Sequence, residues 1–380
     1  MLDFPSAPTV GQKYPQPPLA GVPVYSWDGE KWTTPTQTGI GAVRYDMPQG
    51  LTINQMAQGR SNIGSLKKNY IINGAMMVSQ ENGATAGTAN GYYAVDQISL
   101  SGIGSYTAQQ VASPTPAGSP NRLRVTVTAA HTVAANDLIW LEDRLEGLRV
   151  ADLRYGSAAA KTTTLQIGVK APAGTYCIAF VNIAGAPRSY VAEYVVAAGE
   201  ANTDTVKTVT IPGDVAGTWV ADNTTGLVVR WALMAGTNYQ QTAGSWQSSG
   251  ITASPNQFNL FGTNGNTFEL FDVGLYEGAV APPFMVPDYA SELALCMRYY
   301  EKGTQNFISY MAASGYLGVQ VTFRAMKRAL PTLSALPVAV TNATVLAVDT
   351  AATDGCRMTV QATATGAVSL GATWTANARL

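Results

Sequence analysis

The stretch Leu123-Arg124-Val125-Thr126-Val127 alternates apolar and polar side chains at every position. A period of two residues is typical of a β-strand with one face buried and the other toward water. Turn pairs rich in Asn, Gly and Pro separate it from further alternating or apolar runs at 165–169, 206–211, 227–233 and 268–273. Many short strands at near-regular spacing predict a β-sandwich or jelly-roll domain over residues 69–285.

The composition favours an all-β chain that assembles with other copies. Charged residues make up 12% of the 380 residues, about half the share of an ordinary soluble domain. With so few charges, we expect sister subunits to cover part of the surface. The formal net charge of −1 gives no electrostatic reason to bind nucleic acid or an anionic membrane. No signal peptide or 18-residue apolar run is visible, so we expect synthesis in a cytoplasm and release by lysis or on a particle.

Residues 1–50 are too rich in proline to pack as a domain of their own, so they are expected to form an extended segment. Asp28-Gly29 is a pair typical of a type I′ turn and predicts a small hairpin there. Aromatic residues on and near this hairpin are candidates for docking onto a partner, with a small aromatic core as the structural alternative: Tyr14, Tyr25, Trp27 and Trp32.

Two short helices are expected in the rest of the chain. Residues 51–68 form a junction, and the capping-box pattern from Thr52 to Gln55 predicts a short helix over about 53–60. Residues 286–380 are expected to hold a second helix, at about 288–302, followed by a small β-rich region. Asp288 or Ser291 can cap this second helix, and Gly303 can end it. Its apolar stripe consists of Leu293, Cys296, Met297 and Tyr300.

Motifs from several parts of the chain occur in one order. The N-terminal element reads Y-S-W-D-G-E-K-W from Tyr25 to Trp32, and the junction at 51–64 reads L-T-I-N-Q-M-A-Q-G-R-S-N-I-G. The stretch 269–332 contains L-Y-E-G and then E-L-A-L-C-M-R-Y-Y. This order resembles the tail-fibre and related virion fibre proteins of tailed bacteriophages. The segments 69–76 and 271–278 resemble the first and last strands of carbohydrate-binding-module-like jelly rolls.

The resemblance implies a structural protein of a phage virion, assembled in the cytoplasm of the bacterial host. It implies a homotrimer that attaches to other virion proteins through its N-terminal residues and presents a β-rich head to host surface polysaccharide. Carbohydrate-binding modules of this kind usually place an acidic residue after the first Asn-Gly, where it helps to hold calcium. Ala75-Met76-Met77 stands at that place here, so no metal and no cofactor is expected.

Catalytic signatures are sparse in this sequence. The chain has one histidine, His131, which we interpret as a strand-edge or turn residue. Its three cysteines lack metal-ligand spacing, and we interpret them as buried thiols, with an intersubunit disulfide as the alternative. Paired carboxylates are the remaining route to glycan cleavage. Glu142, Asp143 and Glu146 are the candidates, although their interleaving with Arg144 and Arg149 is typical of a solvated charged stretch. We therefore expect no enzymatic activity.

Aromatic side chains are the better guide to binding, because sugar rings stack on them and polar neighbours read the hydroxyls. Trp140 and Trp231 lie within apolar runs and are expected in the core. The glycan-binding candidates are Tyr92, Tyr93, Tyr239 and Trp246. Three hypotheses stay open: a fibre that adheres to host glycan, a purely structural fibre or decoration protein that binds only virion proteins, and a glycan-cleaving fibre enzyme.

Overall fold

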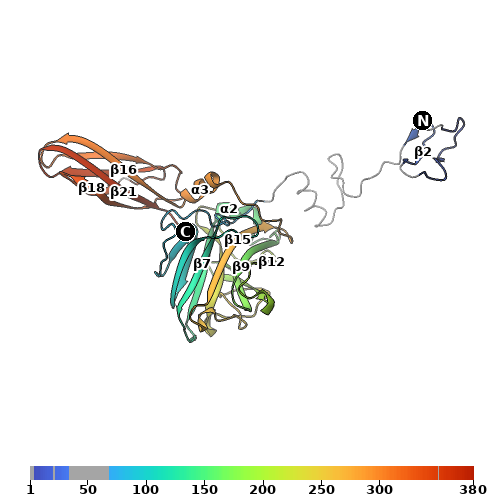
Figure 1. The fold of residues 1–380 in the computed structure, drawn as a ribbon, viewed down its shortest axis with the longest axis horizontal. Coiled ribbons are helices and arrows are strands. Elements are labelled where there is room, and N and C mark those ends of the chain that lie inside the picture. Colours follow the sequence, from blue (N-terminus) through green and yellow to red (C-terminus); the bar gives the residue numbers. More distant parts are fainter. Residues whose placement is uncertain (1–3, 20–21, 34–67, 350) are drawn as a thin grey trace. The chain divides into compact units, whose positions relative to one another are not determined.

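The computed structural model describes residues 4–19, 22–33, 68–349 and 351–380, and the short helix expected over 53–60 lies outside these ranges. The chain divides into two compact units, 1–66 and 67–380, and each is described by itself. Figure 1 shows the elements of both units. Within the described ranges, no helix combines the length and the apolar content that crossing a membrane requires.

The N-terminal unit contains a three-stranded antiparallel sheet of β1 (Lys13–Tyr14), β2 (Tyr25–Trp27) and β3 (Trp32–Thr33). The connection between β2 and β3 has four residues, 28–31, rather than the two-residue type I′ turn expected at Asp28-Gly29. Two backbone N–H groups of this loop donate to Oδ1 of Asp28 at 2.9 Å. The aspartate side chain thus satisfies the loop backbone, so the tighter turn is not needed.

The second unit begins with a sandwich of two antiparallel sheets, as the all-β prediction required. One sheet has seven strands in the order β14-β11-β10-β13-β8-β5-β4, and the other has five in the order β12-β9-β15-β7-β6. Figure 1 shows β7, β15, β9 and β12 of the second sheet side by side. The bounds in the first sheet are β4 Tyr92–Val95, β5 Ile98–Gly102, β8 Leu138–Glu146, β10 Gly174–Asn182, β11 Arg188–Val196, β13 Thr225–Ala235 and β14 Trp246–Gln247. Those in the second are β6 Ser105–Ala112, β7 Asn121–Ala129, β9 Thr163–Lys170, β12 Thr205–Ile211 and β15 Thr267–Glu277.

The core of the sandwich consists of large side chains that both sheets direct between the layers. The largest of these, each at most 1% exposed, are Tyr176, Phe180, Trp231 and Phe268. Trp231 therefore lies in the core as expected. The same expectation is wrong for Trp140, which is half-buried on the outer face of the seven-stranded sheet. Its neighbours Ile139 and Leu141 point inward, and the uniformly apolar run 138–141 could not show which residues do so.

Helix α3 (Tyr289–Met297) follows the sandwich and is shorter than the expected 288–302. Asp288 caps it, since its side chain accepts the backbone N–H of Ser291 at 2.9 Å. Tyr300 already belongs to strand β16 (Tyr300–Met311) and pairs with Asn377. Gly303 lies inside this strand against the ring of Trp374 rather than at a helix end. Cross-strand pairing with a segment about 75 residues downstream thus overrides the local helical preference. A second helix, α2 (Gly147–Val150), is a single turn that directly follows β8.

The C-terminal region is a second, smaller sandwich of two three-stranded sheets, β16-β21-β18 and β17-β20-β19. Its strands are β17 Tyr316–Thr322, β18 Thr332–Thr341, β19 Ala343–Asp349, β20 Gly355–Ala362 and β21 Gly366–Asn377. Met358 and Val360 of one sheet pack against Leu370 and Trp374 of the other. Each sheet therefore buries one face of alternating apolar residues.

A buried ion pair closes the end of the smaller sandwich that adjoins α3. Lys327 and Glu301 have fully buried side chains, with 2.6 Å between Nζ and Oε2. The same Nζ donates to the carbonyl oxygens of Met297 at 2.6 Å and Ala325 at 2.8 Å. Burial lowers the pKa of Lys327, while Glu301 opposes that shift. All three donor positions of the ammonium are used, so this cation is fully satisfied.

We predict that Lys327→Met destabilises the protein strongly, because it leaves the carboxylate of Glu301 buried without its cation. Loss of one partner of a buried pair costs about 3–5 kcal/mol. Thermal denaturation should show this loss, and adding Glu301→Gln to Lys327→Met should recover part of it. Lys302→Met, in which an exposed lysine is removed one strand position from Glu301, is the matched control and should leave the melting temperature nearly unchanged. Equal melting temperatures for Lys327→Met and wild type would contradict the role of the pair.

Candidate functional site: a polar patch on the seven-stranded sheet

The outer face of the seven-stranded sheet has two different halves. The loop over residues 237–257 lies on β10 and β11, where Ala253 packs against Cys177, Ala179 and Val191. Backbone hydrogen bonds fix this loop, including one of 2.9 Å from Gly244 N to the carbonyl oxygen of Val191. This apolar half extends to Leu138 of β8 and to Val228 and Ala232 of β13, and Trp140 packs at its border. The other half of the face, on β4, β5 and β8 together with Arg230 of β13, carries polar and charged side chains instead.

The strand register brings these polar residues into one row. Tyr93 lies opposite Ser99, Ser99 opposite Glu142, and Glu142 opposite Arg230. Residues directly opposite each other on antiparallel strands share a face of the sheet. Side chains alternate along β8, so Trp140 and Arg144, each two positions from Glu142, lie on the same face. We call the four residues at the centre of this face the β8 patch: Trp140, Glu142, Arg144 and Arg230.

Glu142 is the centre of the β8 patch. Its side chain is only 6% exposed and accepts from Nε of Arg144 at 2.5 Å, Nε of Arg230 at 2.6 Å and Nε1 of Trp140 at 3.1 Å. Burial raises the pKa of Glu142, but the charges of Arg230 and Arg144 outweigh burial and leave the pKa below its usual value. The carboxylate is therefore ionised at neutral pH and holds both guanidinium groups in place.

The two arginines keep donors for something else. Each of them reaches Glu142 through Nε, and their terminal nitrogens have no hydrogen-bond partner among the described residues. The side chain of Arg144 is 37% exposed and that of Arg230 is 15% exposed. The guanidinium of Arg230 lies over the Trp140 ring, 5.4 Å from its centroid. The β8 patch thus offers a half-buried aromatic ring, a fixed carboxylate and several free N–H donors within one small area.

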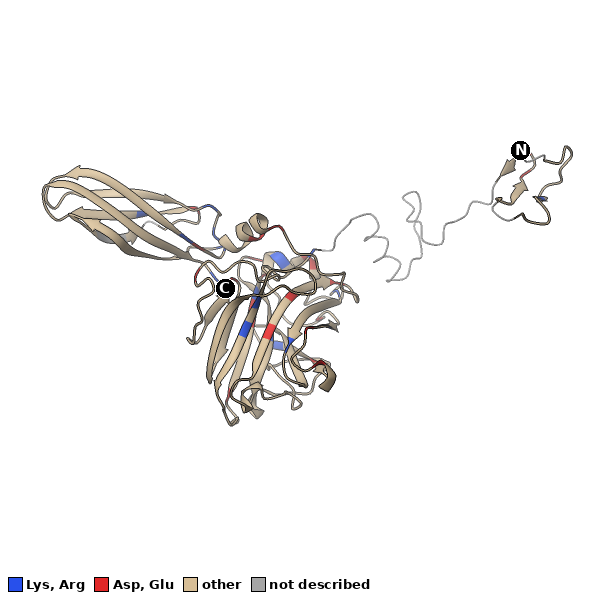
Figure 2. Cartoon of the chain, viewed as in Figure 1, with Lys and Arg blue, Asp and Glu red and all other residues tan. Residues whose placement is uncertain are grey.

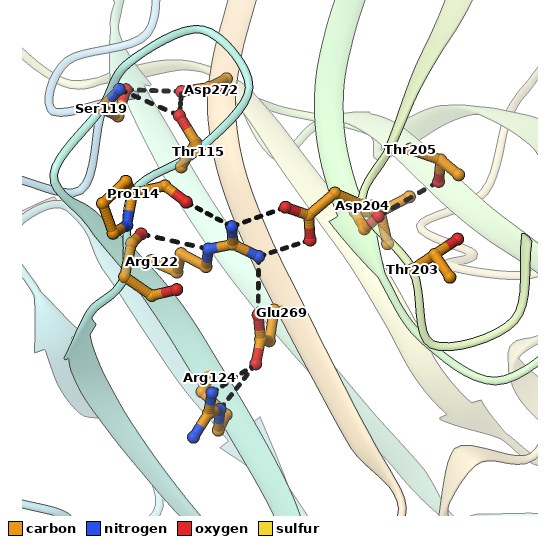
Figure 3. A network of polar contacts seen from close by, with 12 residues as sticks. Pro114, Thr115, Ser119, Arg122, Arg124, Thr203, Asp204, Thr205, Glu269 and Asp272 are labelled. Carbon is orange, nitrogen blue, oxygen red and sulfur yellow. Dashed lines mark hydrogen bonds and ion pairs between the residues drawn. The ribbon is translucent and has the colours of Figure 1, made fainter.

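A second arginine network in the same sandwich shows what a saturated arrangement looks like (Figure 3). On the five-stranded sheet, Arg122 bonds Asp204 at 2.5 and 2.6 Å and Glu269 at 3.1 Å. Its remaining donors reach the carbonyl oxygens of Ser113 and Pro114. Every nitrogen of that guanidinium has a protein partner, so this network fixes two loops to the sheet and leaves no donor for a ligand.

The carboxylates singled out in the sequence do not form a solvated stretch, and that interpretation is wrong. As whole residues, Glu142, Asp143 and Glu146 are at most 5% exposed, because β8 is an interior strand of the sheet. They also have three different surroundings. Glu142 lies in the β8 patch, Asp143 belongs to the other face of the strand, and Glu146 accepts from Arg298 at 2.6 Å and from the hydroxyl of Tyr299 at 2.9 Å. The two hydrogen bonds to Glu146 join the larger sandwich to the segment after α3.

Tyr93 and Tyr92 lie on opposite sides of β4. The guanidinium of Arg379 lies between two rings, 3.9 Å from the centroid of Tyr93 and 4.0 Å from that of Tyr300, and pairs with Glu81 at 2.5 Å. Tyr93 thus shares the row of the β8 patch, but a residue of the chain covers its ring. Tyr92 packs against the core of the larger sandwich and donates its hydroxyl to the carbonyl of Thr85 at 2.6 Å.

Tyr239 and Trp246 are not part of the β8 patch. Tyr239 packs over the apolar half of the sheet face, together with Ile251 and Ala253. Trp246 belongs to a cluster of rings, with its centroid 5.7 Å from that of Tyr190 and 5.6 Å from that of Trp219. Its Nε1 donates to the carbonyl of Pro212 at 2.8 Å. Both rings therefore make contacts within the fold.

The four N-terminal candidates lie together in the first unit. The ring of Phe4 is 5.3 Å from that of Tyr14, 5.0 Å from that of Tyr25 and 5.2 Å from that of Trp32, centroid to centroid. Trp27 joins the group through Trp32, at 5.6 Å. All four candidates are half-buried in this cluster. The small aromatic core considered as the alternative is therefore present.

Two hollows lie elsewhere on the larger sandwich. A groove of about 260 Å³ is lined by Val133, Gly236, Thr237, Gln240, Gln257 and Asn259, among others. A cavity of about 50 Å³ lies beside Tyr155 and Trp219. His131 is hydrogen-bonded to Asp137, with 2.7 Å between Nε2 and Oδ2. In the part of the chain that the structure describes, no group of three or more His, Cys, Asp or Glu residues is arranged to hold a metal ion.

Comparison with known proteins gives likenesses of fold at low identity. No protein-family model and no curated protein matches the chain. Among solved structures, an arabinose-bound GH51 α-L-arabinofuranosidase is similar at 14% identity and a TM-score of 0.33, over 61% of this chain and 30% of that one. The enzymatically active domain of tailspike protein 4 of bacteriophage CBA120 is similar at 11% identity and a TM-score of 0.31, over 55% and 21%. A family 11 carbohydrate-binding module of a Clostridium thermocellum cellulase is similar at 11% and 0.27, over 53% and 99%.

The chain thus spans 30% of the arabinofuranosidase and 21% of the tailspike domain. At these identities and TM-scores the likenesses assign no activity, substrate or partner to this chain.

Asp143 provides a prediction about pH. Its Oδ2 has no hydrogen-bond partner among the described residues, and burial raises the pKa of Asp143 to about 8, with Arg149 acting in the opposite direction. Because this folded-state pKa lies above the usual value of 3.8, the stabilisation is fully present below about pH 4 and is lost as the pH rises through 8. Stability should fall by up to about 1.4 kcal/mol per pH unit in that window. Urea denaturation between pH 5 and pH 9 measures the slope.

Asp143→Asn is the matched variant, because it removes the titration and keeps the shape of the side chain. We expect a smaller pH slope in Asp143→Asn than in wild type, whatever its absolute stability. Identical slopes would show that Asp143 is not the titrating group.

Proposed function

We propose that this chain is a non-enzymatic fibre protein of a tailed-phage virion that binds host surface glycan through the β8 patch. The observation that carries the binding proposal is the union of a half-buried indole, a fixed carboxylate and unpartnered guanidinium N–H groups on one sheet face. The apolar side of a sugar ring packs against an aromatic ring, while charged and polar groups around it bond the hydroxyls. The patch supplies each of these functions.

Binding to glycan gives the first test. Trp140→Ala should weaken binding of the protein to a bacterial glycan array or to host cells by roughly tenfold, since an aromatic contact contributes about 0.5–1.5 kcal/mol beyond area burial. Several copies in one fibre would multiply the loss. Tyr316→Ala, which removes an aromatic ring that is 66% exposed on the smaller sandwich, is the control and should bind as wild type does. Equal binding by Trp140→Ala and wild type would move the site away from the patch.

The positions of the candidate acids do not support the glycan-cleaving alternative. A retaining or inverting pair needs two carboxyl groups that face each other across one bond of the sugar. Glu142 is held by two arginines, Asp143 lies on the other face of β8, and Glu146 is bonded to Arg298 and Tyr299. Release of reducing ends from a bound polysaccharide would revive this alternative.

The purely structural alternative is favoured by one specific feature, the exposed apolar surface of the smaller sandwich. Ile308 is 83% exposed, Tyr310 76%, Leu336 70% and Val338 69%. Figure 2 shows few charged residues on these strands. An uncharged surface with exposed apolar side chains is typical of a protein contact. We propose that other copies of the chain cover it in a homotrimer, and that residues 1–50 attach the trimer to other virion proteins.

The fibre proposal predicts a stable trimer. Light scattering at micromolar concentration should give about three times the chain mass of 39.9 kDa. Ile308→Lys with Leu336→Lys should lower that mass, because lysine at a buried contact carries an unpaired charge. Thr128→Lys with Thr208→Lys, exposed polar positions on strands β7 and β12 of the larger sandwich, is the control and should leave the mass unchanged. Antibodies against the chain should label particles in electron micrographs. A stable wild-type monomer would contradict the trimer, and unlabelled particles would contradict the virion location.

A further inference from the structure

Charge distinguishes the β8 patch from a simple sugar platform. Two guanidinium groups share the single carboxylate of Glu142, so the patch has one unbalanced positive charge. Trp140 and Ser99 add none. Asp143, the nearest acid along β8, lies on the opposite face of the strand and is protonated at neutral pH because burial raises its pKa to about 8. Nothing in the row of the patch therefore neutralises the second arginine.

The β8 patch also contains more hydrogen-bond donors than acceptors. Both arginines are anchored at Nε, which leaves the two terminal nitrogens of each guanidinium for another acceptor. The arginine of the five-stranded sheet, Arg122, shows the opposite arrangement, with carboxylates or carbonyl oxygens on all of its nitrogens. Arg188 is likewise held by Asp214 through Nε and one terminal nitrogen, and by Ser248 through the other. Arg144 and Arg230 stand apart from these structural arginines.

We propose that the β8 patch selects an acidic saccharide, one that carries a carboxylate or another anionic group beside the ring that packs on Trp140. This inference rests on the glycan-binding function proposed above and names the class of its ligand. A planar guanidinium bonds a carboxylate through two parallel N–H groups, and such charge-assisted hydrogen bonds are about twice as strong as neutral ones. Glu142 takes the role of fixing the guanidinium groups, so little conformational entropy is lost when the anion arrives.

The carboxylate of Glu142 also determines where in the patch an anionic group of the saccharide can bind. It lies at the base of the patch, 6% exposed, below the arginine side chains that it holds. An anion that approached Glu142 directly would meet repulsion, whereas one that approached Arg144 would meet donors. Arg144 is the more exposed of the two arginines and is therefore the residue that contacts the anion, with Arg230 supporting the ring and the carboxylate.

The experiment is a glycan array that contains neutral bacterial oligosaccharides together with members that bear uronic acid, pyruvate or phosphate groups, read with the full-length protein. Binding confined to acidic members, with affinity that falls as salt rises, is the expected result. Binding to neutral members alone, or to both classes equally, would overturn the inference and leave the glycan-binding function intact. Binding to no member would overturn both.

Two variants test the assignment to Arg144. Arg144→Gln should lower the affinity for an acidic oligosaccharide by about tenfold or more, and Arg144→Lys should restore only part of it, since lysine keeps the charge but not the planar pair of donors. Arg324→Gln, at an exposed arginine of the smaller sandwich, is the matched control and should bind like wild type. Unchanged acid binding by a folded Arg144→Gln protein, with its melting temperature near that of wild type, would refute the assignment.

Discussion

The alternation of side chains along strand β8 is the constraint on which most of this structure depends. Strand β8 has hydrogen-bonded neighbours on both sides, so neither of its edges is free. Its side chains alternate between two faces, and each face must be covered by what packs on it. Ile139, Leu141 and Leu145 fill the core between the sheets. Trp140, Glu142 and Arg144 reach the outer face, where Glu142 organises two arginines and a tryptophan. One strand thus provides the core of the fold and the centre of the candidate site.

The end of the same strand connects the two sandwiches. Glu146, the last residue of β8, accepts from Arg298 and Tyr299, which lie between α3 and β16. Arg379, next to the C-terminal residue, lies between the rings of Tyr93 and Tyr300 and pairs with Glu81. These contacts bring the smaller sandwich against the strands that border the β8 patch. The ring of Tyr93, a natural platform for a sugar, is used for this connection instead.

Buried charge explains why the charged pattern over 142–149 predicts a solvated stretch that the structure does not form. Acids mixed with arginines are usually solvated, because a charge loses several kcal/mol of hydration when it is buried. Here Glu142 and Glu146 are buried and each pairs with an arginine from a distant segment, Arg230 and Arg298 respectively. Asp143 meets no such partner and responds by a raised pKa. The partners lie 88 and 152 residues away from the acids, which no local pattern can reveal.

The sequence by itself determined the all-β class, the sandwich, the buried cysteines and the presence of a helix after residue 288, because periodicity and capping are local properties of the chain. It left open which face of the strand over 138–146 points outward, because the run 138–141 is uniformly apolar. Only the tertiary structure decided which face that was, that the helix ends at Met297, and that Arg230 joins Glu142. It also placed Tyr239 over the apolar half of the sheet face and Trp246 in a cluster of rings. Each of these outcomes depends on pairing between strands far apart in the chain, and the free energy of that pairing belongs to contacts that no single segment contains.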